Sequence, residues 1–143
     1  MKISARIRNA DGENRVTVAT GGTTQSVAIA AKTNGPGSSV NGGELLMLAL
    51  ATCYCNDLYR EAARMGIDVS AVEVEARGDF DGIGLGAANV RYRARVESSA
   101  AAAGIEALLE RTDAVAEVHN TLRAGRGSAA SRGVPPELSP ASA

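Results

Sequence analysis

The sequence is poor in aromatic residues: they make up 3% of its 143 residues, and tryptophan is absent. Leucine, valine, isoleucine and alanine must therefore fill the interior, and side chains of this size build a modest core. A chain of this length fits one domain. Because a core of small residues often gains stability by burying surface against a second copy, we expect the chain to associate with itself.

Long apolar runs and blocks of like charge are also missing. The net charge is −1, so no electrostatic footprint for nucleic acid is visible. The longest apolar run, residues 45–55, is broken only by Thr52 and has about half the ~20 residues that a bilayer-spanning helix needs. Residues 1–12 alternate in polarity and lack the apolar core of a signal peptide. We expect a cytoplasmic protein with no nucleic-acid or membrane partner.

The N-terminal region alternates polar and apolar residues, which is typical of strands. This pattern covers residues 2–8, 15–20 and 25–31, and the segments are separated by the turn dipeptides Asp11-Gly12 and Gly21-Gly22. The sequence therefore predicts a three-stranded meander.

A loop rich in glycine, over residues 33–43, precedes a long helix over residues 43–65. Asn41 with Glu44 three residues later predicts a capping box at the helix start, and Gly66 predicts its end. The first half of the helix is apolar on all sides, so we expect it to be buried on every side, in a core or at a dimer interface. The second half is amphipathic.

The rest of the chain predicts two strands, two helices and a tail. The strands cover residues 68–77 and 88–96, and the helices cover 98–110 and 113–125, with Ser98 or Ser99 and then Asp113 as caps. The order βββ-α-ββ-α-α defines an α+β domain over residues 1–125. Residues 126–143 contain almost no large apolar side chain and are expected to be a disordered tail.

The two cysteines, Cys53 and Cys55, both lie in the long helix. Side chains two positions apart point about 200° away from each other on a helix. A disulfide between them is therefore implausible, and a shared metal site is disfavoured. His119, the only histidine, could approach in space, but the set would still be a weak zinc site, and we expect no metal or other cofactor. Buried cysteine is common, which favours a packing role for both side chains. A nucleophilic cysteine instead needs a nearby cation, such as an arginine from elsewhere in the chain. The residues alone leave both interpretations open.

Other polar residues near the cysteines have simple interpretations. Asp57 with Arg60, and Glu61 with Arg64, are spaced three apart, as on the solvated face of a helix. His119 is interpreted as a surface or interface residue of a short amphipathic helix rather than as a catalytic base.

The element order, the segment "GGELLMLALATC" at the helix start and the following "GIDVSAVEVEARGDFDG" together resemble the OsmC/Ohr family. The resemblance covers about residues 2–125. It implies an OsmC-like α+β fold and an intertwined homodimer, with the long helices buried at its centre and the sites at the subunit interface.

The resemblance also implies site residues. Counted from Leu45, Cys53 falls on the peroxidatic cysteine of the family, and Cys55 is one that the pattern does not require. Glu44 directly precedes that leucine, as in the broader OsmC-like branch. In the organic-hydroperoxide branch the glutamate sits one residue earlier, where this chain has Gly43.

The family arginine comes from the N-terminal strands, where Arg15 is the best match and Arg6 and Arg8 are fallbacks. In the family, arginine stabilises the thiolate, and glutamate orients the arginine. The thiolate attacks the peroxide bond and becomes a sulfenic acid.

A second, downstream cysteine then closes a disulfide in the family, but this chain has no cysteine after Cys55. The corresponding region contains His119 and Asn120 instead. The resemblance thus leaves two functions open. One is a one-cysteine peroxidase that reduces organic or small hydroperoxides with an external thiol. The other is a catalytically degenerate relative that binds a small hydrophobic or thiol-reactive ligand in the dimer cleft.

Overall fold

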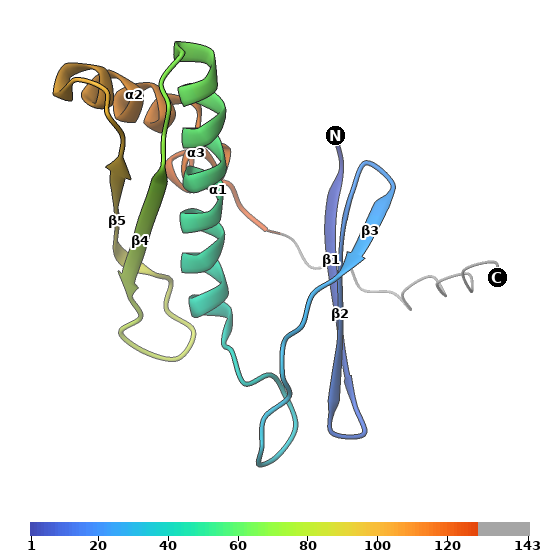
Figure 1. Cartoon of the computed structure of the whole chain (residues 1–143). Coiled ribbons are helices and arrows are strands. Elements are labelled where there is room, and N and C mark those ends of the chain that lie inside the picture. Colours follow the sequence, from blue (N-terminus) through green and yellow to red (C-terminus); the bar gives the residue numbers. More distant parts are fainter. Residues whose placement is uncertain (129–143) are drawn as a thin grey trace.

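The computed structural model describes residues 1–128 and confirms the predicted α+β class and element order (Figure 1). The elements are β1 (Ile3–Ala10), β2 (Glu13–Thr20), β3 (Thr23–Ser26), α1 (Gly42–Met65), β4 (Ala71–Asp79), β5 (Ala88–Glu97), α2 (Ala102–Val115) and α3 (Glu117–Arg123). They form two antiparallel sheets, a meander in the order β1-β2-β3 and the hairpin β4-β5. The tail predicted over residues 126–143 falls almost entirely outside the described residues.

The third strand is shorter than predicted. Periodicity over residues 25–31 predicted a strand, but β3 ends at Ser26. The side-chain amide of Asn14 donates to the carbonyls of Ile29 and Ala30, at 3.3 and 3.1 Å. The Ala30 carbonyl also accepts from the Ser39 backbone N–H at 2.9 Å, so this segment pairs with the following loop instead of extending β3.

The ends of the long helix agree with the prediction. The Asn41 side chain accepts from the Glu44 backbone N–H at 2.9 Å, and the Glu44 carboxylate accepts from the Asn41 N–H at 2.7 Å. This reciprocal pair is a complete capping box. At the other end Gly66 has φ of 66°, the left-handed conformation that glycine adopts without steric cost.

The caps predicted for the last two helices are wrong. The residue before α2 is Ala101, which offers no side-chain cap, and the Ser98 hydroxyl instead donates to the Asp68 carbonyl at 2.6 Å. Asp113 lies inside α2, and α3 begins only at Glu117. Ser98 thus fastens the residue after β5 to the loop between α1 and β4 rather than starting a helix.

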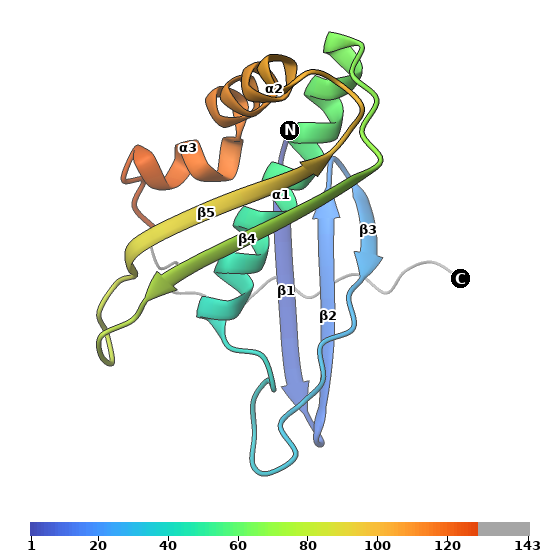
Figure 2. The ribbon, with the colours of Figure 1, turned by 60° about the vertical axis from the view of Figure 1, so that its left-hand side comes forward.

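The core lies where α1 packs on the β4-β5 hairpin and α2 and α3 pack on α1 (Figure 2). Its buried side chains are Tyr54, Leu58, Ala62, Leu108 and Ala116. Three of these lie on α1, so the long helix is the central element of this part of the chain. None of the helices in residues 1–128 is long and apolar enough to cross a membrane.

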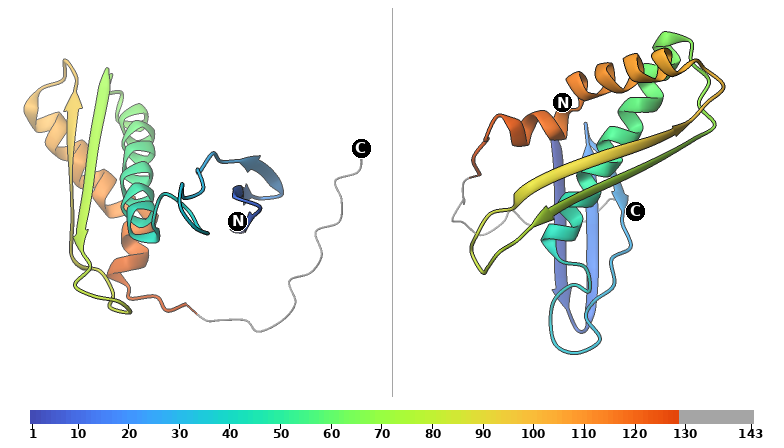
Figure 3. Two further views of the ribbon diagram at one scale, coloured as in Figure 1. Left: turned by 90° about the horizontal axis from the view of Figure 1, so that it is seen from below. Right: turned by 90° about the vertical axis from the view of Figure 1, so that its left-hand side faces the viewer.

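The β1–β3 meander stands apart from this core (Figures 1 and 3). It makes no extensive contact with α1 or with the second sheet. Ile3 and Ile7 on β1 are 70% and 52% exposed, and Leu48 on α1 is 60% exposed. Within residues 1–128 of one chain the first half of α1 is therefore not buried on every side, because the face that carries Leu48 is left uncovered.

Candidate functional site

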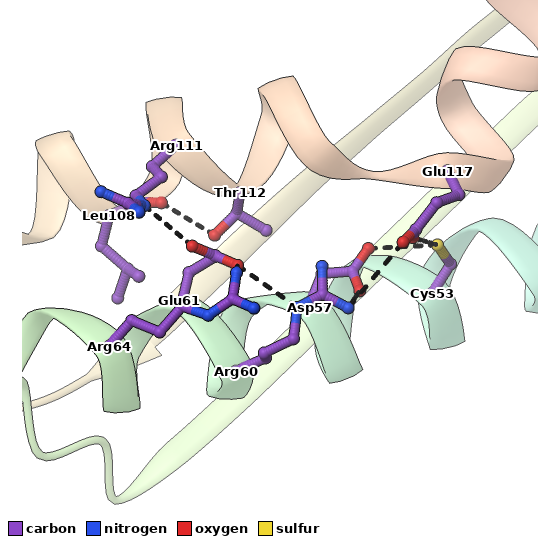
Figure 4. A network of polar contacts seen from close by, with 9 residues as sticks. All are labelled: Cys53, Asp57, Arg60, Glu61, Arg64, Leu108, Arg111, Thr112 and Glu117. Carbon is purple, nitrogen blue, oxygen red and sulfur yellow. Dashed lines mark hydrogen bonds and ion pairs between the residues drawn. The ribbon is translucent and has the colours of Figure 1, made fainter.

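The Cys53 thiol lies where α1 meets the start of α3 (Figure 4). The side chain is half-buried, and both it and Cys55 are free thiols. The Cys53 Sγ donates to Oδ2 of Asp57, one helical turn further on, at 3.3 Å. A longer contact of 3.9 Å joins Sγ to Oε2 of Glu117 on α3. The sulfur therefore faces two carboxylates from two different elements.

A guanidinium group is present next to these carboxylates but not next to the sulfur. Arg60 Nη1 lies 2.8 Å from Oδ1 of Asp57 and 3.9 Å from Oε1 of Glu117. Throughout residues 1–128, the only side-chain partners within hydrogen-bonding distance of the Cys53 sulfur are the two carboxylates. Arg60 thus balances the charge of the carboxylates rather than stabilising a thiolate.

The electrostatics of one chain favour the protonated thiol. Burial raises the pKa of Cys53, and the hydrogen bond to Asp57 raises it further, while a backbone hydrogen bond from Val118 acts in the opposite direction. Burial also raises the pKa of Asp57, against the lowering effect of the Cys53 hydrogen bond. An activated thiolate would need a positive charge beyond those that residues 1–128 of one chain place near the sulfur.

The two i, i+3 ion pairs predicted on α1 are formed, but their carboxylates are buried. Asp57 is 3% exposed and Glu61 is fully buried, so the prediction of a solvated face is wrong. A sequence signal for this exists: the spacing from Leu50 to Tyr54, Asp57 and Glu61 is four, three and four residues, which places the carboxylates on the core-facing stripe. The sequence interpretation missed two residues of the site, Asp57 and Glu117.

Glu61 joins α1 to α2 through charge-assisted hydrogen bonds (Figure 4). Its carboxylate accepts from Arg111 Nε of α2 at 2.8 Å and from Arg64 Nη1 at 2.7 Å. Arg60 Nε adds a third bond at 3.2 Å. The Arg111 hydrogen bond is the main cause that lowers the pKa of Glu61. This cluster holds the helix that carries Cys53 against α2.

The structure of one chain does not bring Glu44 or Arg15 to Cys53. Glu44 is engaged in the cap of α1, nine residues before Cys53, which corresponds to about 13 Å along the helix axis. Arg15 is exposed on β2, where it pairs in register with Arg8. The meander does not pack on α1, so the structure leaves Arg15 away from Cys53.

A metal ion has one candidate set of ligands in the described residues. Single ligand atoms of Cys53, Asp57 and Glu117 lie within 4.8 Å of one another. Arg60 already pairs with both carboxylates, so a cation at this position would have to compete with its guanidinium group. The set also lacks an imidazole. Its contacts are those of a hydrogen-bonded ion cluster.

His119 is a core residue, and its interpretation as a surface or interface residue is wrong. The side chain is 4% exposed, because its ring packs edge-on against Tyr92 and Tyr54, with ring centres 4.2 and 5.6 Å apart. Burial lowers the pKa of His119. Neither ring nitrogen has a hydrogen-bond partner in the part of the chain that the structure describes.

These features define an α+β protein with a free thiol where a long central helix meets a shorter one. Residues 35–126, more than half of the chain, match the family model described as OsmC-like protein. The chain belongs to the OsmC-like family.

Solved structures share the fold at low sequence identity. An OsmC-like protein from Mycoplasma pneumoniae matches with a TM-score of 0.58 and 16% identity, over 85% of this chain and 86% of that one. An organic hydroperoxide resistance protein from Elizabethkingia anophelis, with thiocyanate bound, has a TM-score of 0.58 and 17% identity, over 86% and 89%. An OsmC-like hydroperoxide resistance protein from Jannaschia matches with a TM-score of 0.54 and 16% identity, over 95% of this chain and 93% of that one. No curated protein matches the sequence.

Proposed function

We propose that this chain is a cysteine-dependent redox protein that reduces organic or small hydroperoxides, with Cys53 as its reactive thiol. The observation that carries the proposal is that the Cys53 thiol is free and half-buried where α1 meets the start of α3. Because Asp57 raises the pKa of this thiol, the reaction also needs a positive charge that stabilises the thiolate. Membership of the OsmC-like family supports hydroperoxide reduction, and so does the structural similarity to hydroperoxide resistance proteins.

The reaction needs one cysteine and two equivalents of an external thiol. The Cys53 thiolate attacks one oxygen of the hydroperoxide, so that an S–O bond forms, the O–O bond breaks and the alkoxide leaves as an alcohol after protonation. Cys53 is then a sulfenic acid. One external thiol displaces water to give a mixed disulfide, and a second thiol releases the Cys53 thiol and an external disulfide.

A homodimer would supply the missing positive charge. The apolar residues Ile3 and Ile7 of the meander are exposed, and so is Leu48 on α1. Both surfaces lack a partner among residues 1–128 of one chain, and docking the meander of one copy onto the other would cover them. The same docking would carry Arg15 toward the second copy, where a guanidinium beside Cys53 would stabilise the thiolate.

A second candidate function is binding without turnover, of a small hydrophobic or thiol-reactive ligand in the dimer cleft. The specific observation in its favour is the acidic surrounding of Cys53, where Asp57 and Glu117 face the sulfur and burial raises the thiol pKa. Gly43 at the glutamate position of the organic-hydroperoxide branch also favours this candidate.

Oxidation of Cys53 by cumene hydroperoxide tests the proposal. The purified chain is treated with the peroxide, and Cys53 oxidation is followed by mass spectrometry beside the variants Cys53→Ser and Cys55→Ser. We expect oxidation well above the rate of free cysteine, lost in Cys53→Ser and kept in Cys55→Ser. Adding an external thiol should restore the reduced protein. Oxidation no faster than that of free cysteine would contradict the peroxidase and leave the binding function.

A further inference from the structure

The two carboxylates at the Cys53 sulfur differ in their access to solvent (Figure 4). Glu117 comes within 3.9 Å of Sγ through Oε2, and its side chain is 70% exposed. Asp57, which accepts from the thiol at 3.3 Å, is buried. A molecule that approaches the sulfur from solvent can therefore contact the carboxylate of Glu117, whereas that of Asp57 is covered.

The charge of Glu117 is also the more weakly paired of the two. Arg60 Nη1 lies 2.8 Å from Asp57 but 3.9 Å from Glu117, close to the limit of an ion pair. Arg60 Nε is engaged by Glu61 at 3.2 Å. A hydrogen bond from its own backbone N–H lowers the pKa of Glu117, so the carboxylate is ionised at neutral pH. An exposed and weakly paired negative charge therefore lies beside the sulfur.

The external thiol of the proposed cycle has to come close to this charge. In the mixed disulfide the external group is attached to the Cys53 sulfur, and so lies within reach of Glu117. An ammonium group two carbons from the external sulfur can pair with the Glu117 carboxylate, whereas an anionic group at that position is repelled. At an exposed site such a pair changes a rate by about two- to fivefold.

We propose that Glu117 selects the external thiol that reacts at Cys53, and that it favours small aminothiols with a positively charged ammonium group over neutral and anionic thiols. This inference rests on the proposed function, in which Cys53 is the reactive thiol, and adds the class of its reductant. One aminothiol displaces water from the Cys53 sulfenic acid and forms the mixed disulfide. A second aminothiol breaks that disulfide, so that the Cys53 thiol is released and the two aminothiols leave oxidised as their disulfide. Glu117 forms no covalent bond and acts by its charge.

Disulfide exchange tests the selection without any peroxide, because it forms the same mixed disulfide. The full-length chain in a Cys55→Ser background is reacted with cystamine, which ends in ammonium groups, or with bis(2-hydroxyethyl) disulfide, which has the same spacer and no charge. The Cys53 thiolate attacks one sulfur of the probe, a new S–S bond forms, the S–S bond of the probe breaks and one thiol leaves. Mass spectrometry follows the adduct. Both probes react with the same thiolate, so the ratio of the cystamine rate to the rate of the neutral probe does not depend on the pKa of Cys53.

We expect this ratio to fall about two- to fivefold in Glu117→Gln, and to fall further in Glu117→Lys, which places a positive charge beside the sulfur. Added salt should lower the ratio for the chain that keeps Glu117 and should change the ratio for Glu117→Gln less, because salt screens exposed charges. Glu106→Gln, which neutralises an exposed glutamate elsewhere on α2, should leave the ratio unchanged. A purely structural role of Glu117 would change both rates alike and keep their ratio.

The same ratio with glutamate, glutamine and lysine at position 117 would overturn the proposal, and so would a chain that forms no mixed disulfide with either probe. If Glu117→Gln does not fold, Glu117→Lys and the salt dependence decide. Failure of the proposed peroxidase gives a different result. A chain that prefers cystamine through Glu117, but is oxidised by cumene hydroperoxide no faster than free cysteine, keeps the selection and loses the peroxide reaction. Rapid oxidation of Cys53 with an unchanged ratio would keep the peroxidase and reject the selection.

Discussion

The two parts of the chain differ in how they bury their apolar residues. From α1 to α3, Leu50, Leu58 and Leu108 are each at most 1% exposed. In the β1–β3 meander no side chain is buried, and Ile3 on its first strand is 70% exposed. Both parts have regular strands and good turns, so local sequence patterns alone do not produce a core. The later part carries its own core, whereas residues 1–128 of one chain offer the meander no surface on which to bury its apolar side chains.

The same division runs through the candidate site. Cys53, Asp57 and Glu117 all belong to the part with a core, where they are held by packing and ion pairs. Arg15, the cation implied by the family resemblance, belongs to the meander. The site as proposed is therefore complete only if the meander of one copy docks on the core of another.

The largest expected effect comes from removing core volume on α1. Leu58 is fully buried, so Leu58→Ala should lower the free energy of unfolding by about 2–5 kcal/mol. Ile7→Ala shortens a side chain of similar size in the exposed meander. This variant should shift the midpoint of unfolding only at protein concentrations at which the chain associates. Urea denaturation at two protein concentrations measures both. A concentration-independent loss of several kcal/mol for Ile7→Ala would show that the meander has a core of its own.

The next effect is expected at the junction of the two parts, the cap of α1. Asn41→Ala removes the side chain that accepts from the Glu44 N–H, so the free energy of unfolding should fall by about 1 kcal/mol. The rate of Cys53 alkylation should not change, because the cap lies more than two helical turns away.

Glu44→Gln separates the capping role of Glu44 from a catalytic one. Glutamine can still accept from the Asn41 N–H, as the Glu44 carboxylate does at 2.7 Å, so stability should be nearly kept. Peroxide reduction that falls in Glu44→Gln at unchanged stability would assign the carboxylate to the reaction. Unchanged reduction would leave Glu44 as a cap.

The sequence predicted the elements of this fold well because each is encoded locally. Alternation gave the strands, and Asn41, Glu44 and Gly66 gave the ends of α1, which the structure confirms. The strand after residue 25 is shorter than predicted because the Asn14 side chain binds the carbonyls of Ile29 and Ala30, and the Ser39 backbone N–H also binds that of Ala30. The sequence of the segment itself does not show these contacts.

The candidate site was harder to predict because its groups come together only by packing. The family resemblance pointed to Cys53, but the two carboxylates that face its sulfur come from different elements, and Glu117 lies 64 residues further along the chain. Asp57 was read as solvated because i, i+3 charge pairs are usually exposed. The burial of His119 likewise depends on Tyr54 and Tyr92, which only the fold brings to it.

The most local effect is expected at the thiol itself, in the pH dependence of its alkylation. In a Cys55→Ser background only Cys53 reacts with iodoacetamide, and the rate follows the thiolate fraction. The Asp57 carboxylate holds the thiol proton and repels a thiolate, so it raises the pKa of Cys53. Asp57→Asn should therefore move the alkylation midpoint to lower pH and raise the rate at neutral pH, while Asp68→Asn, an exposed control, should change neither.

The same alkylation profile decides where the activating charge comes from. If Arg15 of a second copy stabilises the Cys53 thiolate, the associated protein should have a lower midpoint than protein kept dissociated by Ile7→Asp in the exposed face of β1. Arg15→Gln should then raise the midpoint of the associated protein alone. Equal alkylation midpoints in the associated protein, in Ile7→Asp and in Arg15→Gln would mean that the pKa of Cys53 is set by charges of its own chain, those of Asp57, Glu117 and Arg60. The uncovered meander would then complete the fold of the assembly without completing the site.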